Sequence, residues 1–271
     1  MGVNDIILSG NMRQNLTNLQ AVAMLQARTS LRLATGLRVN SAVDDPSAYF
    51  AAQNNRSRAN DLAARKDAMG EAIQTVKTAD GGIKAITSLI EQAKGLAASA
   101  RSAGTTDAAA LATQFNSLLT QIDNIATDAL YKGKNLLNSD TVTVQFNESG
   151  SSTLAIVGFN AKATAGLGIA TAAGSWATSA NIDTAVTQLD TALTTLRNNS
   201  KSLSANLGVV SARQEFTTDL VATLTEGADN LTAADTNAEG ANMLALQTRQ
   251  QLGITALSLS NQAQQGILRL F

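Results

Sequence analysis

The chain contains one proline among 271 residues, Pro46, and it follows two adjacent aspartates, Asp44 and Asp45. Proline inside a helix removes a hydrogen-bond donor and clashes with the preceding turn, so a chain with so little of it can form very long helices. Asp-Pro is also a helix start signal, because aspartate caps the first turn and proline fits the first helical position. Gly36 can end a preceding helix by adopting a positive φ. The stretch 36–45 is therefore predicted to connect two helices.

Apolar residues recur at steps of three and four along most of the chain, which predicts helices. Ser41 with Asp44 forms a second, capping-box-like start signal just before the proline. The pair Gly81–Gly82 is a predicted weak point, because glycine is a poor helix former. Thr105 or Thr106 is predicted to cap a later helix. The predicted helical tracts are 12–33, 46–101, 106–129, 181–230 and 242–271.

Between the helical tracts the pattern changes to the two-residue period of β-strands. The segments TVTVQF (141–146) and STLAIVGF (152–159) are rich in β-branched residues, and Asn, Glu, Ser and Gly separate them. This arrangement predicts a β-hairpin over about 141–159. The next segment, 160–180, is rich in Gly, Ala and Thr and is predicted to be a loop with little regular structure.

The composition favours close helix packing over a bulky aromatic core. Hydrophobic residues make up 44% of the chain, but aromatic residues make up only 3%. Alanine and leucine, both strong helix formers, supply most of the apolar surface. The predicted fold is mainly α: an elongated helical bundle with a small β-hairpin.

The residue types that are missing exclude several classes of enzyme. The chain has no histidine and no cysteine. It therefore lacks the commonest general base, the usual zinc ligands and any disulfide. Carboxylate chemistry remains conceivable, but no pair of acids stands out. We expect no catalytic residues, no cofactor and no metal site.

Charge and hydropathy argue against two kinds of partner. The 20 basic and 21 acidic residues are spread along the chain without a basic block, so no nucleic-acid partner is expected. No segment is long and apolar enough to predict membrane insertion. The first residues have no basic region followed by an apolar run, so no secretory signal is predicted either. By these rules alone the protein would be assigned to the cytoplasm.

The two ends of the chain share a character that the centre lacks. Both are amphipathic, rich in Asn and Gln and poor in charge. Two helices with thin apolar stripes are marginal alone and can stabilise each other by pairing as in a coiled coil. The apolar ending GILRLF favours association with other molecules over frayed helix ends. The residues predicted to serve assembly are Met12, Leu16, Leu19, Ala23, Leu31, Leu252, Leu257, Ile267, Leu268, Leu270 and Phe271.

Three segments carry a resemblance to a known family. LRLATGLRVNSAVDDPS resembles the N-terminal signature of bacterial flagellins, with Thr35 and Val39 in place of the usual Ser and Ile. NMLALQTRQQLGITALSLSNQAQQGILRLF resembles their C-terminal signature, and YKGKNLL stands where flagellins carry a turn before their hairpin. The short middle of the chain is similar to short flagellins of alphaproteobacteria, which lack the outer D2 and D3 domains. The residues that match the connector motif are Gly36, Leu37, Arg38, Asn40, Ser41, Ala42, Asp44 and Asp45.

The resemblance implies a domain organisation. Residues 1–35 with 238–271 would form the inner-tube domain as paired terminal helices. Residues 36–45 would be the spoke connector, and 46–237 would be the outer-tube helical bundle with its hairpin.

The resemblance also implies a function and partners. The chain would be a structural subunit, not an enzyme, that polymerises with other flagellin copies into the extracellular bacterial flagellar filament for swimming. Flagellins leave the cell through the flagellar type III export apparatus, so the partners would include that apparatus, an export chaperone and the filament cap. This replaces the cytoplasmic assignment. The alternatives are a flagellin-like hook–filament junction protein, which the compact middle disfavours, and a cytoplasmic helical scaffold, which would need no apolar C-terminus.

Many flagellins carry O-linked sugars on outward-facing hydroxyl groups. In this chain such residues crowd the hairpin and the loop after it. The candidate sites are Ser151, Ser152, Thr153, Thr164, Thr171, Ser175 and Thr178, and ordinary solvated loop residues are the alternative reading for each.

Overall fold

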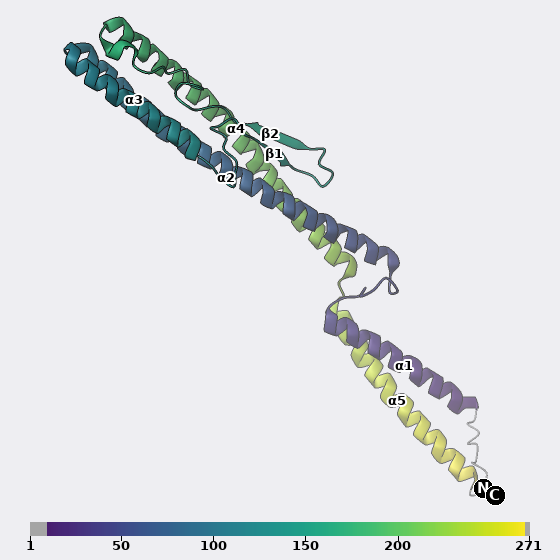
Figure 1. The fold of residues 1–271 in the computed structure, drawn as a ribbon. Coiled ribbons are helices and arrows are strands. Elements are labelled where there is room, and N and C mark those ends of the chain that lie inside the picture. Colours follow the sequence, from purple (N-terminus) through teal and green to yellow (C-terminus); the bar gives the residue numbers. More distant parts are fainter. Residues whose placement is uncertain (1–9, 269–271) are drawn as a thin grey trace, which may run out of the picture. The chain divides into compact units, whose positions relative to one another are not determined.

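The computed structural model describes residues 10–268, so the predictions at Leu270 and Phe271 lie outside the described residues. This part of the chain is mainly helical with one small antiparallel sheet, which confirms the predicted fold class (Figure 1). Its elements are α1 (Gly10–Thr35), α2 (Pro46–Ser102), α3 (Thr105–Asp128), β1 (Thr141–Gln145), β2 (Thr153–Val157), the 3-10 turn η1 (Ala173–Trp176), α4 (Ser179–Thr232) and α5 (Thr236–Leu268).

The chain divides into two compact units. One comprises the chain up to Ser57 together with the chain from Leu224 onward, and the other is Arg58–Thr223. The first unit contains α1 and α5, and the second contains α3, the hairpin and most of α2 and α4.

The start and stop signals around the connector are confirmed. Gly36 has a φ of +69° and its N–H donates to the carbonyl of Arg32 at 2.8 Å, which ends α1. Asp45 caps α2, because its Oδ1 accepts the N–H of Ala48 at 3.0 Å and its carbonyl accepts the N–H of Tyr49. Pro46 is the first residue of α2, where its missing N–H costs nothing.

Two other predicted signals are wrong. Ser41 and Asp44 do not begin a helix: the Asp44 carboxylate binds the N–H groups before it and closes a turn instead. Neither Thr105 nor Thr106 caps α3, since the N-cap residue is Gly104 and no side chain bonds to the first turn. Glycine is tolerated at this position almost as well as a capping side chain.

At Gly81–Gly82, the predicted weak point, α2 continues without a break. A Cβ on Gly82 would lie 2.6 Å from Cδ1 of Leu137 and 3.2 Å from the Cβ of Ala129. Gly82 therefore provides the space for the segment after α3 to pack against α2. Gly81 has open space on the same helix.

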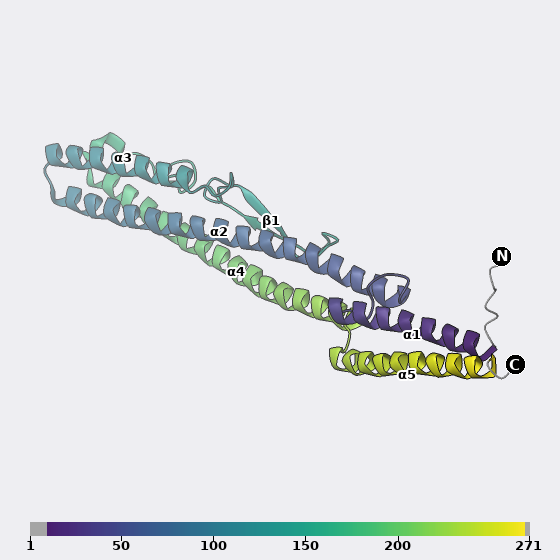
Figure 2. The same cartoon turned by 90° about the horizontal axis from the view of Figure 1, so that it is seen from below.

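The core of the Arg58–Thr223 unit lies between α2, α3 and α4, which run alongside one another in both views (Figures 1 and 2). Small residues such as Ala93, Ala97 and Ala112 let these helices approach closely, and all three are buried. The main aromatic contact of this core is Phe115 with Trp176, whose ring centroids are 4.8 Å apart. Both rings are fully enclosed, so the loop that contains η1 is fixed to α3.

The hairpin is confirmed, with slightly shorter strands than predicted. β1 and β2 pair antiparallel, with Thr141 opposite Val157 and Gln145 opposite Thr153. Val144 and Ile156 are buried on the face that joins the core, whereas Val157 is exposed. The loop after the hairpin contributes more to the core than its composition suggests. Its buried residues are Ala161, Ala163, Leu167, Ile169 and Trp176.

Candidate assembly surfaces

Helices α1 and α5 form an antiparallel pair. They lie side by side in both views (Figures 1 and 2). Arg32, near the end of α1, meets Glu239, near the start of α5, with Nη1 and Oε1 2.7 Å apart. Farther along, a Cβ on Gly253 would lie 2.5 Å from Cδ1 of Leu19, so the helices approach closely at that glycine.

The less exposed positions of both helices recur at alternating steps of three and four, which is the spacing of a coiled-coil seam. Asn15, Gln26 and Gln250 place half-buried amides within this seam, where polar residues fix the register of paired helices. The seam consists of Met12, Asn15, Leu19, Val22, Gln26, Thr29 and Leu33 on α1 and of Glu239, Met243, Leu246, Gln250, Gly253, Leu257 and Ser260 on α5.

The ion pair between Arg32 and Glu239 lies inside the seam. The two side chains are only 20% and 11% exposed. A carboxylate in such a position needs its partner, because removing the partner leaves an uncompensated charge. The pair therefore fixes the end of α1 against the beginning of α5.

Large apolar side chains also cover the outside of the α1–α5 pair. Leu252 and Leu259 are 63% and 67% exposed, and Met24 is 69% exposed. A soluble monomer rarely exposes so many apolar groups together, and such surfaces mark sites of association. The exposed apolar surface of the pair consists of Leu16, Met24, Leu25 and Leu31 on α1 and Leu244, Leu252, Ile254 and Leu259 on α5.

The residues predicted for assembly fall into three groups. Met12, Leu19 and Leu257 lie in the seam, whereas Leu16, Ala23, Leu31 and Leu252 are exposed on the outside. Ile267 and Leu268 belong to α5, but their side chains lie outside the described residues, as do Leu270 and Phe271.

Sequence reasoning missed much of the outer surface. Met24 and Leu25 on α1 and Leu244, Ile254 and Leu259 on α5 are exposed apolar residues that the single predicted stripe did not include. Their signal was present in the sequence, because Leu244, Leu252 and Leu259 recur at the near-seven spacing of a second helical face.

The connector is bound to the end of α4 through its backbone. The N–H groups of Arg38 and Val39 both donate to the carbonyl of Thr232, at 2.7 and 3.2 Å. The N–H of Ala234 returns a bond to the carbonyl of Gly36 at 2.9 Å. Val39 is 2% exposed, so this short ladder also encloses an apolar side chain.

Asp44 organises the middle of the connector. Its Oδ2 accepts hydrogen bonds from the N–H groups of Asn40 and Ser41, at 3.2 and 3.1 Å, and from the Ser41 hydroxyl at 3.1 Å. Desolvation raises the pKa of Asp44, but these bonds and the Arg28 guanidinium 4.0 Å away outweigh it and lower the pKa below its ordinary value. Asp44 is therefore an acceptor that depends on staying ionised.

Other matched residues of the connector motif have defined contacts. Arg38 donates from Nη2 to the carbonyl of Leu231 at 3.1 Å. The amide of Asn40 donates to the Thr35 hydroxyl and to the carbonyl of Leu37. The motif therefore encodes a turn whose polar groups bind within the connector and to the adjoining ends of α1 and α4.

The tip of the hairpin is held by charged side chains. Arg58 donates from Nε to Glu148 at 3.0 Å, and Arg213 lies over the ring of Phe146, 5.3 Å from its centroid. The backbone N–H of Glu148 and then Arg58 lower the pKa of Glu148, against desolvation.

Of the candidate glycosylation sites, Ser152 is half-buried. The exposed ones are Ser151, Thr153, Thr164, Thr171, Ser175 and Thr178.

Neither a metal centre nor a membrane span is found in the described part of the chain. Its His, Cys, Asp and Glu residues form no group of three that could hold a metal ion. None of its helices combines the length and the apolarity needed to cross a bilayer.

Family models match both ends of the chain. The bacterial flagellin N-terminal helical region matches residues 3–141, and the bacterial flagellin C-terminal helical region matches residues 179–271. The first match covers the connector, and the second covers α4 and α5 as the structure describes them.

Full-length relatives agree with the family models. Flagellin FljO of Caulobacter vibrioides is 31% identical over 273 residues that cover 100% of both chains. A flagellin of Brucella melitensis is 31% identical and covers 94% of this chain and 98% of its own. A crystal structure of Bacillus cereus flagellin matches 54% of this chain and 86% of its own at 20% identity, with a TM-score of 0.47. On the family models and the full-length relatives, the chain belongs to the bacterial flagellin family.

Proposed function

We propose that this protein is the structural subunit of a bacterial flagellar filament, in which its copies polymerise outside the cell for swimming. Family membership over both ends of the chain supports this function. The observation that carries it is the exposed apolar surface of the α1–α5 pair. Neighbouring copies would bury these side chains and supply the burial that two thin helices lack by themselves.

In this proposal the terminal helices, residues 1–35 and 238–271, form the inner tube. Residues 36–45 are the spoke, and 46–237 form the outer tube. The seam residues hold each pair together, and Leu16, Ala23, Leu31 and Leu252 contact neighbouring copies. We assign Ile267, Leu268, Leu270 and Phe271 to the same contacts on the basis of their apolar character.

The protein acts by assembly and not by catalysis. The absence of histidine and cysteine from the sequence supports this, since the familiar hydrolytic and metal-dependent sites need them. Family resemblance supports export through the flagellar type III apparatus, with an export chaperone and the filament cap as further partners. The lack of disulfides is compatible with a chain that travels unfolded.

The proposal is tested by making the outer surface of α5 polar. In L252Q/L259Q, electron microscopy should show no filaments, because two exposed apolar contacts are replaced by amides. Circular dichroism of the monomer should be unchanged, since both side chains point away from the seam. L130Q is the control, because Leu130 is comparably exposed, at 56%, but lies outside both helices. Normal filaments from L252Q/L259Q would overturn the assignment of this surface.

A further inference from the structure

The exposed face of α4 carries a charge pattern that is complementary to itself. Arg197 and Lys201 stand one turn apart, and Glu215 and Asp219 stand one turn apart farther along. An α-helix turns by about 100° per residue, so all four residues lie within about 20° of Gly208 around the axis of α4 and share one face with it. Gly208 is the midpoint between Arg197 and Asp219 and also between Lys201 and Glu215.

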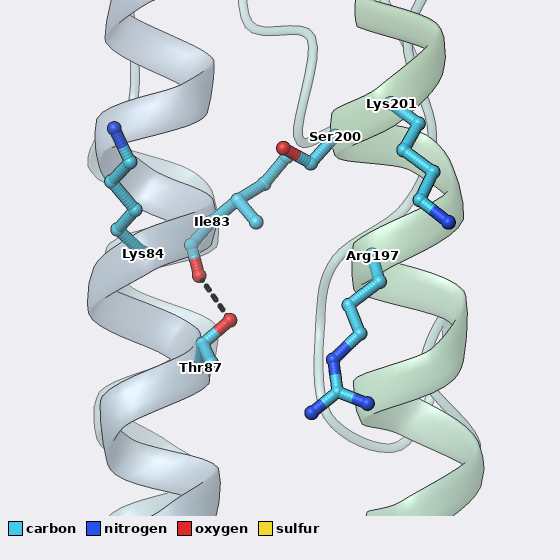
Figure 3. Close-up of a pocket in the computed structure, with 6 residues that line it drawn as sticks. All are labelled: Ile83, Lys84, Thr87, Arg197, Ser200 and Lys201. Atoms are coloured by element: carbon cyan, nitrogen blue, oxygen red, sulfur yellow. Dashed lines mark hydrogen bonds between the residues drawn. The ribbon is translucent and has the colours of Figure 1, made fainter.

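These charged side chains are available to a partner. All are exposed, and none takes part in an ion pair with another described residue. The nearest basic group on α2, Lys84, is by contrast already paired, with Asp80 at 2.7 Å. Figure 3 shows Arg197 and Lys201 extending from α4 beside a groove of about 400 Å³, which Ile83 and Thr87 of α2 also line.

The centre of the face permits close approach. Ser204, Ala205, Ser211 and Ala212 are exposed, and a Cβ on Gly208 would meet nothing within 4 Å. The core of the unit lies on the opposite side of α4, where Leu203, Val210 and Thr217 are buried. A second helix could therefore lie along this face without displacing any side chain of the core.

We propose that this face of α4 binds the same face of a second copy in antiparallel orientation, with a two-fold axis at Gly208. Arg197 then meets Asp219 of the second copy, Lys201 meets its Glu215, and the reciprocal pairs form as well. A parallel pair in register would place like charges opposite each other, which is repulsive. A parallel pair shifted along the helix axis would bring only half of the charged side chains opposite a partner of the other sign.

The pairing is closed, because a two-fold interface uses the same patch on both copies and cannot propagate. Filament growth requires an interface that propagates, so a subunit held in this pair is withheld from growth. That consequence rests on the proposed filament function, whereas the pairing itself does not. Exposed ion pairs are weakened by salt, so the pair should form at low ionic strength and separate at high ionic strength.

Cysteine cross-linking of the full chain tests this geometry. The chain has no native cysteine, so every disulfide must form between the introduced residues. In the antiparallel pair Ser204 faces Ala212 of the other copy, whereas the two Ser204 residues are separated by about 12 Å along the axis. That separation exceeds the roughly 7 Å that a disulfide can span. Mixing S204C with A212C under mild oxidation should give about tenfold more disulfide-linked dimer than either variant alone. Equal yields from single variants, or no dimer in the mixture, would overturn the pairing.

Charge exchange tests the contacts, with sedimentation velocity to separate dimers from monomers and from filaments. R197E/K201E should lose the dimer at low salt by at least about tenfold, and so should E215K/D219K. The variant that carries all four substitutions should recover it, because every pair is restored with its signs exchanged. K77E/K134E is the control, since it makes the same charge change at exposed residues away from this face. A folded four-substitution variant that stays monomeric would refute the proposal, whether or not the protein forms filaments.

Discussion

Asp44 holds the connector by staying ionised, and this predicts how the connector responds to acid. Its pKa lies below the ordinary value of 3.8, so the carboxylate stabilises the folded connector above that value. The stabilisation is lost as the pH falls through the lowered pKa. The amide NMR signals of Asn40 and Ser41 should therefore be constant above about pH 5 and titrate together with a midpoint below 3.8.

D44N should abolish this shared titration, whereas D61N should preserve it, because Asp61 is exposed on α2 and bonds to no connector residue. A midpoint at or above 3.8 in the native chain would contradict the hydrogen-bond network.

Asn135 is an example of a structurally important residue that sequence reasoning does not identify. It is 4% exposed, and its side-chain amide donates to the carbonyls of Ala126 and Thr127 at 2.9 Å, closing the end of α3. Its Oδ1 accepts the N–H of Leu137, at 2.8 Å. An asparagine before two leucines in a loop gives no local sign of such a role, because the partners become neighbours only after the chain has turned.

The helices themselves were predictable, because their boundaries depend on local chemistry. Gly36 and Pro46 act through their own backbone geometry and Asp45 through its capping side chain, and each acts as predicted. The face along which α1 pairs with α5 was not predictable from a single stripe. Leu19 serves the seam while Leu16 and Leu31 lie outside it, so the apolar pattern of one helix combines two different surfaces.

Gly81 and Gly82 offer a matched test of helix packing. Gly81→Ala should raise the free energy of unfolding by about 1 kcal/mol, because alanine is the better helix former and the site is open. Gly82→Ala should lower it by about 1–3 kcal/mol, because the new methyl overlaps the buried side chain of Leu137. Urea denaturation of both variants measures the difference. Equal stabilisation by the two substitutions would show that the segment after α3 can move away without cost.

The two compact units differ greatly in buried apolar surface. Among the described residues of α1 and α5, only Met12 and Leu246 are buried apolar side chains. The Arg58–Thr223 unit encloses a continuous core that includes Phe115, Trp176 and Leu196. Ordering each residue costs about 1–2 kcal/mol of backbone entropy, so we expect the terminal pair to need burial against other copies, whereas the central core is buried within its own unit.

This difference predicts where the isolated subunit opens. In dilute monomer, amide hydrogens of α1 and α5 should exchange within minutes, while those of α2 and α4 around Ile86 and Leu189 stay protected for hours, because local opening follows the density of buried contacts. In assembled filaments the amides of α1 and α5 should become at least about a hundredfold slower, since neighbouring copies cover Leu252 and Leu259. Hydrogen exchange read by mass spectrometry of peptides from both units measures this.

The L252Q/L259Q monomer is the control and should exchange as the native monomer does. Strong protection of α1 and α5 in the native monomer would mean that the seam alone holds the pair, and that the outer apolar surface is not needed for its stability.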